Sequence, residues 1–152
     1  MRNVTSDKIV NVTVMDPIVR NVLGDATVGM SAGPNGSIIH LVDGSAQNVA
    51  IAEAAFEGYW ALQVNADKET IQANNTDTVT ITCNDPQLAN LTHVQYYVLF
   101  DGLQYAMGQA ELVNGGITLE LASDTPGDFI VIIWSDVNYK SGAVIVRCLD
   151  GN

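Results

Sequence analysis

The chain has 152 residues, of which 47% are apolar and 15% are charged, and its 17 acids against six bases give a formal net charge of −11. This length suits one ordinary domain or two small ones. Nucleic-acid binding is disfavoured because it needs a basic surface that contacts phosphates, and binding to an anionic membrane surface is disfavoured for the same reason.

No apolar run approaches the roughly 20 residues that a membrane-spanning helix needs. The N-terminal stretch MRNVTSDKIVNVTV lacks the apolar core of a signal peptide. The chain therefore acts where it is made, leaves by another route, or is part of a longer protein.

Residues 1–58 are predicted to form a small, β-rich N-terminal segment with one short helix. Residues 8–14 carry valine at positions 10, 12 and 14, which predicts a strand that Asp16-Pro17 ends. Gly33-Pro34-Asn35-Gly36 predicts a turn, followed by a short strand over residues 37–42. A segment this small buries a modest core, so we expect it to be completed by a partner or by the rest of the chain.

The expected helix of this segment covers residues 46–57. Ser45 is its predicted N-cap, because serine there accepts a hydrogen bond from a free N–H of the first turn. Val49, Ala52 and Phe56 then fall on one stripe.

Residues 59–152 are predicted to form an antiparallel β-sandwich of immunoglobulin type. Apolar residues alternate with polar ones in short segments, and turn residues separate the segments, which is typical of such sandwiches. The seven expected strands cover residues 60–64, 78–83, 93–100, 109–113, 117–121, 128–134 and 143–148.

Two of these strands carry further information. Asn114-Gly115-Gly116 lies between residues 109–113 and 117–121, and two glycines that tolerate positive φ predict a hairpin. Residues 128–134 are apolar at every position after Asp128. This strand is therefore expected to be central or covered on both faces.

The stretch KETIQANNTDTVTITC at residues 68–83 resembles the entry into bacterial immunoglobulin-like domains of the invasin and intimin kind. The matching residues are Thr70-Ile71, Ala73, Asp77 and Val79-Thr80-Ile81, and a later match is Gly127-Asp128-Phe129-Ile130-Val131. The resemblance spans about residues 60–149. It implies that the first strand runs through Ile71, that Asp77 lies in the following turn, and that the next strand carries an alternating apolar face. It implies no catalytic residue.

Gly29-Met30-Ser31-Ala32-Gly33 matches the G-x-S-x-G pattern of a nucleophile elbow. That motif needs a strand before it and a helix after it, whereas Pro34-Asn35-Gly36 follows at once. The pattern therefore favours a flexible loop and no catalysis.

Other candidates for chemistry have simpler interpretations. His40 and His93 are expected in strands as satisfied or exposed residues, because neither has a Cys or carboxylate at ligand spacing. Glu53 and Glu57 lie one helical turn apart, which favours a solvated helix face. The turn at residues 136–138 lacks the glycine and bidentate glutamate of an EF-hand. We therefore predict no catalytic, cofactor-binding or metal-binding residue.

The two cysteines, Cys83 and Cys148, are compatible with one disulfide or two free thiols. In the expected topology they end the second and the seventh strand, which run in opposite directions. They should therefore lie about one strand length, roughly 20 Å, apart, whereas a disulfide needs Cα atoms within about 7 Å. Both thiols are predicted to be free, with Cys83 buried and Cys148 available for an intermolecular contact.

These features favour a structural role without enzymatic activity. The layout, a small attachment segment joined to one immunoglobulin-like domain, resembles capsid decoration proteins of tailed phages. The resemblance implies a location in the virion, capsid or other virion proteins as partners, and a homo-oligomer. A collar or tail component, an adhesin or pilus-like module of the bacterial cell surface, and a carbohydrate-binding accessory domain of an enzyme remain open alternatives.

Overall fold

The computed structural model describes residues 2–150, which divide into two separately packed units. The first unit runs to Ala61 and also includes Asp136–Ser141, and the second comprises Leu62–Ser135 and the residues from Gly142 onward. The division that the sequence suggests, after residue 58, lies three residues before this boundary.

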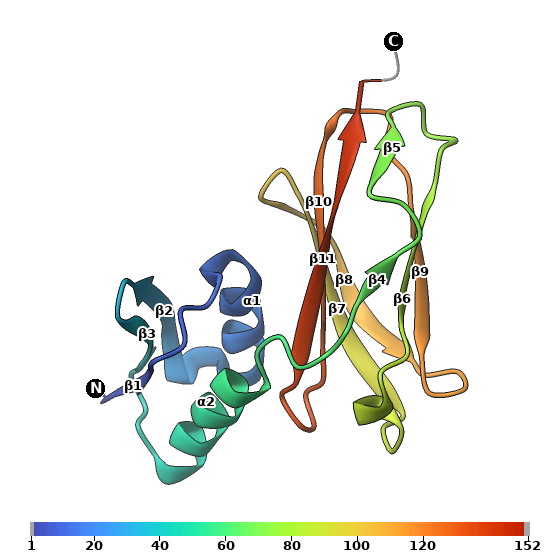
Figure 1. Cartoon of the computed structure of the whole chain (residues 1–152). Coiled ribbons are helices and arrows are strands. Elements are labelled where there is room, and N and C mark those ends of the chain that lie inside the picture. Colours follow the sequence, from blue (N-terminus) through green and yellow to red (C-terminus); the bar gives the residue numbers. More distant parts are fainter. Residues whose placement is uncertain (1, 151–152) are drawn as a thin grey trace. The chain divides into compact units, whose positions relative to one another are not determined.

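The first unit is a three-stranded antiparallel sheet with strand order β1-β3-β2 and two helices (Figure 1). Val4, Ile39 and Leu41 on one face of the sheet pack with apolar residues of both helices, which gives this unit its own core. Neither helix is long and apolar enough to cross a membrane, as judged on the residues described. The elements are β1 (Arg2–Ser6), α1 (Val12–Leu23), β2 (Thr27–Gly33), β3 (Gly36–Leu41) and α2 (Ala46–Gly58).

The prediction of a strand over residues 8–14 is wrong, because helix α1 begins at Val12. The Asn11 side chain caps the helix by accepting a hydrogen bond from Thr13 N at 3.0 Å. Pro17 lies inside the helix and does not end it. The alternating valines concealed a second, longer pattern with the helical period, whose buried members are Val14, Met15, Ile18, Val19 and Leu23.

Helix α2 and strand β3 confirm the other predictions for this segment. Ser45 caps α2 by accepting from Asn48 N, and Ala52 and Phe56 are buried. Lys8 Nζ donates to the carbonyl oxygens of Phe56 and Glu57 at 2.8 and 3.2 Å, which satisfies acceptors at the C-terminal end of the helix.

The second unit is an immunoglobulin-type β-sandwich, as the sequence predicts. A five-stranded sheet with order β5-β11-β10-β7-β8 faces a three-stranded sheet with order β4-β6-β9 (Figure 1). The first strand is split between the sheets, because β4 pairs with β6 while β5 runs parallel to β11. The strands are β4 (Asn65–Ala66), β5 (Thr70–Gln72), β6 (Val79–Cys83), β7 (His93–Phe100), β8 (Leu103–Glu111), β9 (Ile117–Leu121), β10 (Gly127–Trp134) and β11 (Ser141–Leu149).

Two details of the predicted sandwich are wrong. Residues 60–64 form no strand, because Trp60 has a φ of 62° and pairing begins only at Asn65. Asn114 and Gly115 form the predicted tight turn with the positive φ expected of them, and a bridge between Val113 and Gly116 closes it. The flanking strands β8 and β9 do not pair with each other, so the predicted hairpin does not form. The turn instead carries the chain from β8 in one sheet to β9 in the other.

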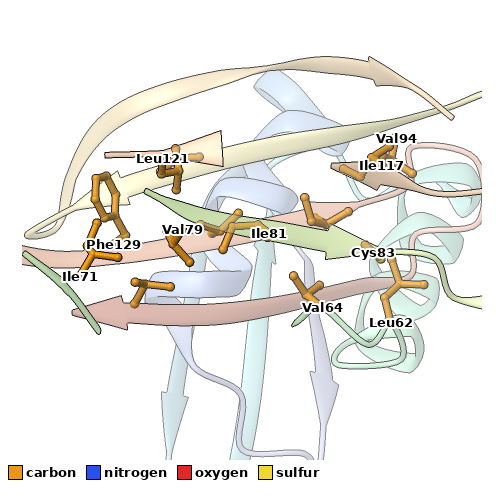
Figure 2. Close-up of a cluster of buried hydrophobic side chains, with 14 of the residues drawn as sticks. Leu62, Val64, Ile71, Val79, Ile81, Cys83, Val94, Ile117, Leu121 and Phe129 are labelled. Atoms are coloured by element: carbon orange, nitrogen blue, oxygen red, sulfur yellow. The ribbon is translucent and has the colours of Figure 1, made fainter. Parts of the chain in front are cut away.

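The core of the sandwich lies between its two sheets, and β10 is central, as predicted. Figure 2 shows side chains from both sheets meeting there, with Phe129 of β10 toward the same end of the core as Val79, and Ile81 farther along β6. The Phe129 ring has its centroid 4.8 Å from that of Phe100 and meets Tyr105 edge-on at 5.3 Å. Such aromatic contacts add to the stabilisation from burial.

Both cysteines are free, which confirms the prediction made from strand direction. Cys83 ends β6, whereas Cys148 pairs in register with Ile71, and Figure 2 places Ile71 at the other end of the core from Cys83. The expectation that Cys148 is available for an intermolecular contact is wrong, because only 3% of it is exposed. Burial raises the pKa of both thiols, so both are poor nucleophiles.

Candidate functional site

The outer face of the three-stranded sheet is the part of the first unit where residues of chemical interest meet. Successive side chains of a strand point to opposite faces, so Val4, Ile39 and Leu41 face the core while Asn3, Thr5 and His40 face outward. Asn3 and Thr5 are exposed and His40 is half-buried. This outward face carries these polar side chains around the half-buried, apolar Ile38.

His40 joins all three strands of this sheet through its ring. Its Nε2 lies 3.1 Å from Ser31 Oγ on β2, and its Nδ1 lies 3.1 Å from Asn3 Oδ1 on β1. Because an amide oxygen only accepts hydrogen bonds, Nδ1 donates to Asn3 Oδ1, and the Nδ1–H tautomer leaves Nε2 to accept from the Ser31 hydroxyl.

The ladder register explains why these three side chains meet. Asn3 lies directly opposite His40, and Ser31 pairs with Ile38, so Ser31 and His40 are diagonal neighbours on one face. Ser31 and His40 belong to separate sequence patterns, neither of which predicts their contact. The predicted turn at residues 33–36 carried the signal, because a tight hairpin there places positions 31 and 38 opposite each other.

The G-x-S-x-G segment lies on strand β2 and not in the loop that the sequence favours. The ladder with β3 holds it extended as far as Gly33. Ser31 also borders a hollow of about 400 Å³ at the end of this hairpin. The hollow is lined by Thr5, Ser6 and the residues from Ser31 to Ile38.

Ser31, His40 and Asn3 have the connectivity of a nucleophile, a base and an orienting group. Acyl transfer also needs N–H donors aimed at the developing oxyanion. The backbone N–H groups of a sheet lie in its plane, whereas these side chains stand perpendicular to it, and Pro34 beside the hollow has no N–H. The arrangement therefore fits a rigid, hydrogen-bonded surface better than a hydrolytic centre.

The remaining candidates lie in regular elements of the two units. His93 lies at the start of β7 with Nδ1 3.1 Å from Thr92 Oγ1, and Glu53 and Glu57 are exposed on α2. Among residues 2–150, no group of three His, Cys, Asp or Glu side chains is placed to hold a metal ion.

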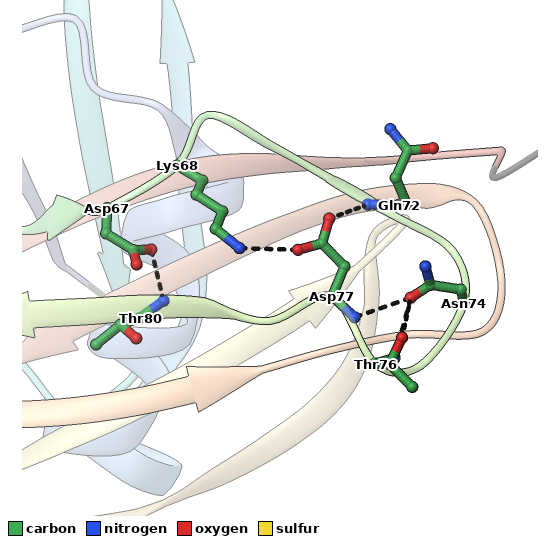
Figure 3. A network of polar contacts seen from close by, with 7 residues as sticks. All are labelled: Asp67, Lys68, Gln72, Asn74, Thr76, Asp77 and Thr80. Atoms are coloured by element: carbon green, nitrogen blue, oxygen red, sulfur yellow. Dashed lines mark hydrogen bonds and ion pairs between the residues drawn. The ribbon is translucent and has the colours of Figure 1, made fainter.

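The stretch at residues 67–80 forms a polar network that fixes the crossing from β5 to β6 (Figure 3). Asp77 accepts from Lys68 Nζ and from Gln72 N, both at 2.8 Å. The hydrogen bond from Lys68, followed by that from Gln72 N, lowers the pKa of Asp77. Asn74 Oδ1 accepts from Asp77 N and from both the N–H and the hydroxyl of Thr76. Asp77 thus lies in the turn, as the resemblance implies, and its role there is structural.

No protein-family model and no curated protein matches the chain. Among solved structures, 27 chains are similar to it. A C-terminal intimin fragment in complex with the intimin-binding domain of its translocated receptor is 24% identical, with a TM-score of 0.37, and the match covers 57% of this chain and 30% of the fragment.

Two further structures illustrate the breadth of these similarities. A CARDB domain from Pyrococcus furiosus, solved with two metal ions, is 12% identical over 59% of this chain and 93% of its own, with a TM-score of 0.41. A superoxide reductase from Ignicoccus hospitalis is 13% identical, with a TM-score of 0.38, and the match covers 57% of this chain and 77% of the reductase. At these values none of the similarities carries an argument about activity or partners.

Proposed function

We propose that the chain is a structural, non-enzymatic accessory protein of a tailed-phage virion that decorates the capsid. The first unit attaches to the particle and the immunoglobulin-like sandwich is exposed on it. Capsid or other virion proteins are the partners.

The outer face of the three-stranded sheet is the observation on which this proposal rests. It is exposed, uncharged and held in place by the bonds from His40 to Ser31 and Asn3. Uncharged polar side chains lose less solvation on burial than charged ones do. The hollow of about 400 Å³ beside Ser31 offers a place for a protruding side chain of the partner.

The distribution of charge supports the same division of roles. The sandwich unit has ten acids against two bases, a net charge of −8, and the first unit has seven against four, a net charge of −3. Strong like charge keeps proteins soluble and separate. The acidic sandwich thus suits exposure to solvent, and the less charged unit suits burial in an assembly.

The test compares two threonine variants in cosedimentation with particles made from the gene cluster that encodes the chain. Thr5→Arg places a long cation on the proposed attachment face, beside the hollow. Thr118→Arg makes the same change at an exposed position of β9 in the sandwich. We expect Thr5→Arg to weaken binding about tenfold or more, which is about 1.4 kcal/mol, and Thr118→Arg to bind like the original chain.

The outcomes separate the alternatives. Loss of binding in Thr118→Arg alone would mean that the sandwich is the attaching part. Failure of the original chain to bind any particle would reject the virion role, and binding to bacterial cells instead would support the adhesin alternative.

Chemical labelling of Ser31 tests the proposal that the chain is not an enzyme. Fluorophosphonate probes label serines that a histidine activates as nucleophiles. Because the proposed role needs no such serine, we expect no labelling of the folded chain. Labelling that disappears in both Ser31→Ala and His40→Ala would show that the three residues act as a nucleophilic centre.

A further inference from the structure

Strand β8 is an uncovered edge of the five-stranded sheet. It pairs with β7 on one side, and the strand order ends there in the part of the chain that the structure describes. Alternate residues of an edge strand direct their N–H and C=O groups away from the sheet, where they can pair with another strand.

The other long strand near an edge, β11, is protected. Its C-terminal part pairs with β5, from Arg147 to Leu149. Near its start, a Cβ added to Gly142 would clash with the carbonyl oxygen of Leu62, so the segment at Leu62 lies against the strand. Strand β8, with nine residues, is therefore the long exposed edge of this sheet.

The regular part of β8 lacks the features that prevent edge pairing. Edge strands are commonly kept apart by Lys, by Pro, by β-bulges or by being short. LQYAMGQAE has neither Lys nor Pro, and its one irregularity lies near Tyr105, before the regular ladder. Its register with β7 is irregular between Val98 and Leu99, so the regular ladder comprises residues 106–111. Of these six residues only Glu111 is charged, in a unit with a net charge of −8.

We propose that β8 pairs antiparallel with β8 of a second copy of this chain, about a two-fold axis at Gly108. This axis lies near the middle of the regular ladder. It places Ala106 opposite Ala110 and Met107 opposite Gln109 of the other copy. The result is a continuous sheet of ten strands, five from each copy.

The regular ladder of β8 favours a second copy as the occupant of this edge, because two acidic copies can meet there without like charges facing each other. A two-fold axis at Gly108 keeps the two Glu111 side chains six residue steps apart, roughly 20 Å, which exceeds the screening length of about 8 Å at physiological salt. The uncharged edge offers nothing that selects a basic or an acidic peptide. The contact is smaller than a standard interface, so the dimer is weak, and the net charge of −11 on each copy opposes it further.

Analytical ultracentrifugation of the full chain over about 10 µM to 1 mM tests the pairing, because weak dimers form in this range. We expect a monomer–dimer equilibrium that strengthens as NaCl rises from about 50 to 500 mM, since salt screens the repulsion between acidic copies. A chain that stays monomeric throughout, or a dimer that weakens with salt, would overturn the proposal.

Two lysine variants locate the contact. Met107 is 49% exposed on β8, and Ile145 is 58% exposed on β11 of the same sheet. Met107→Lys should weaken the dimer about tenfold, whereas Ile145→Lys, with the same change of charge, should leave it intact. Equal weakening by both variants, or weakening by Ile145→Lys alone, would place the contact elsewhere.

The double variant Met107→Lys/Gln109→Glu tests the register. In the proposed pairing each new lysine faces a new glutamate of the other copy, and opposite charges on facing residues stabilise a sheet. We therefore expect the double variant to recover most of the affinity that Met107→Lys loses. A double variant as weak as the single one would reject the axis at Gly108. The proposal is independent of the virion role, because it concerns association of the chain with itself.

Discussion

Phe129 provides the sharpest test of the sandwich, because it is fully buried on the central strand β10. Replacing a buried Phe by Ala typically costs 3–5 kcal/mol of stability through lost burial and the cavity left behind. The Phe129 ring also loses its contacts with Phe100 and Tyr105, and aromatic pairs are worth about 0.5–1.5 kcal/mol beyond burial. For Phe129→Ala we therefore expect a loss of about 4–5 kcal/mol in the free energy of unfolding.

Urea denaturation followed by tryptophan fluorescence measures this loss. The chain has two tryptophans, the exposed Trp60 in the first unit and the buried Trp134 on the same strand as Phe129. A Trp60→Phe background leaves Trp134 as the only reporter, so the signal comes from the sandwich.

The neighbouring residue Ile130 is the matched control. It lies on the opposite face of β10 and is half-buried, so Ile130→Ala should cost less than about 2 kcal/mol. A shift of one residue in strand register would exchange the two faces. A larger loss in Ile130→Ala than in Phe129→Ala would therefore refute the register that underlies the whole sandwich.

Further predictions concern the thiols, the crossing between sheets and metal dependence. Mass spectrometry of the unreduced protein should find Cys83 and Cys148 alkylated only after denaturation, and an intact bridge between them would contradict the strand assignment. Because its pKa is lowered, the Asp77 carboxylate stabilises the fold above its unfolded pKa of about 3.9, and this contribution is lost as the pH falls through the lower folded value. Asp77→Asn should therefore be less stable at pH 7 and lose less stability on acidification, and equal acid sensitivity in both proteins would refute this role. A chelator should leave the melting temperature unchanged, and a fall of many degrees would reveal a metal site.

The sandwich could be predicted because its strands follow one simple period. In β6, Val79, Ile81 and Cys83 are buried while the threonines between them are less so, as alternation predicts. Which strands pair was harder to predict. The turn at Asn114 and Gly115 has the local conformation of a hairpin, yet the long-range ladders of β8 with β7 and of β9 with β6 determine its context.

The first unit shows the limits of local patterns more clearly. Valines at positions 10, 12 and 14 satisfy the period of a strand, while Val14, Ile18 and Val19 satisfy that of a helix. Short apolar segments are ambiguous between the two. The N-cap at Asn11 was the signal that could have decided between them, since asparagine is among the best N-cap residues.

The contact between Ser31 and His40 shows why the candidate site could not be found from either residue alone. A histidine on a strand and a serine in a common motif are each unremarkable, and only the ladder register of β2 with β3 brings their side chains to 3.1 Å. The same register holds the surrounding backbone in a sheet, whose N–H groups lie in the plane of the sheet and do not point toward a ligand on its face. The feature that unites the residues thus also removes the donors that hydrolysis needs. The attachment role that we propose for this face, and the absence of labelling that we expect at Ser31, both depend on this geometry.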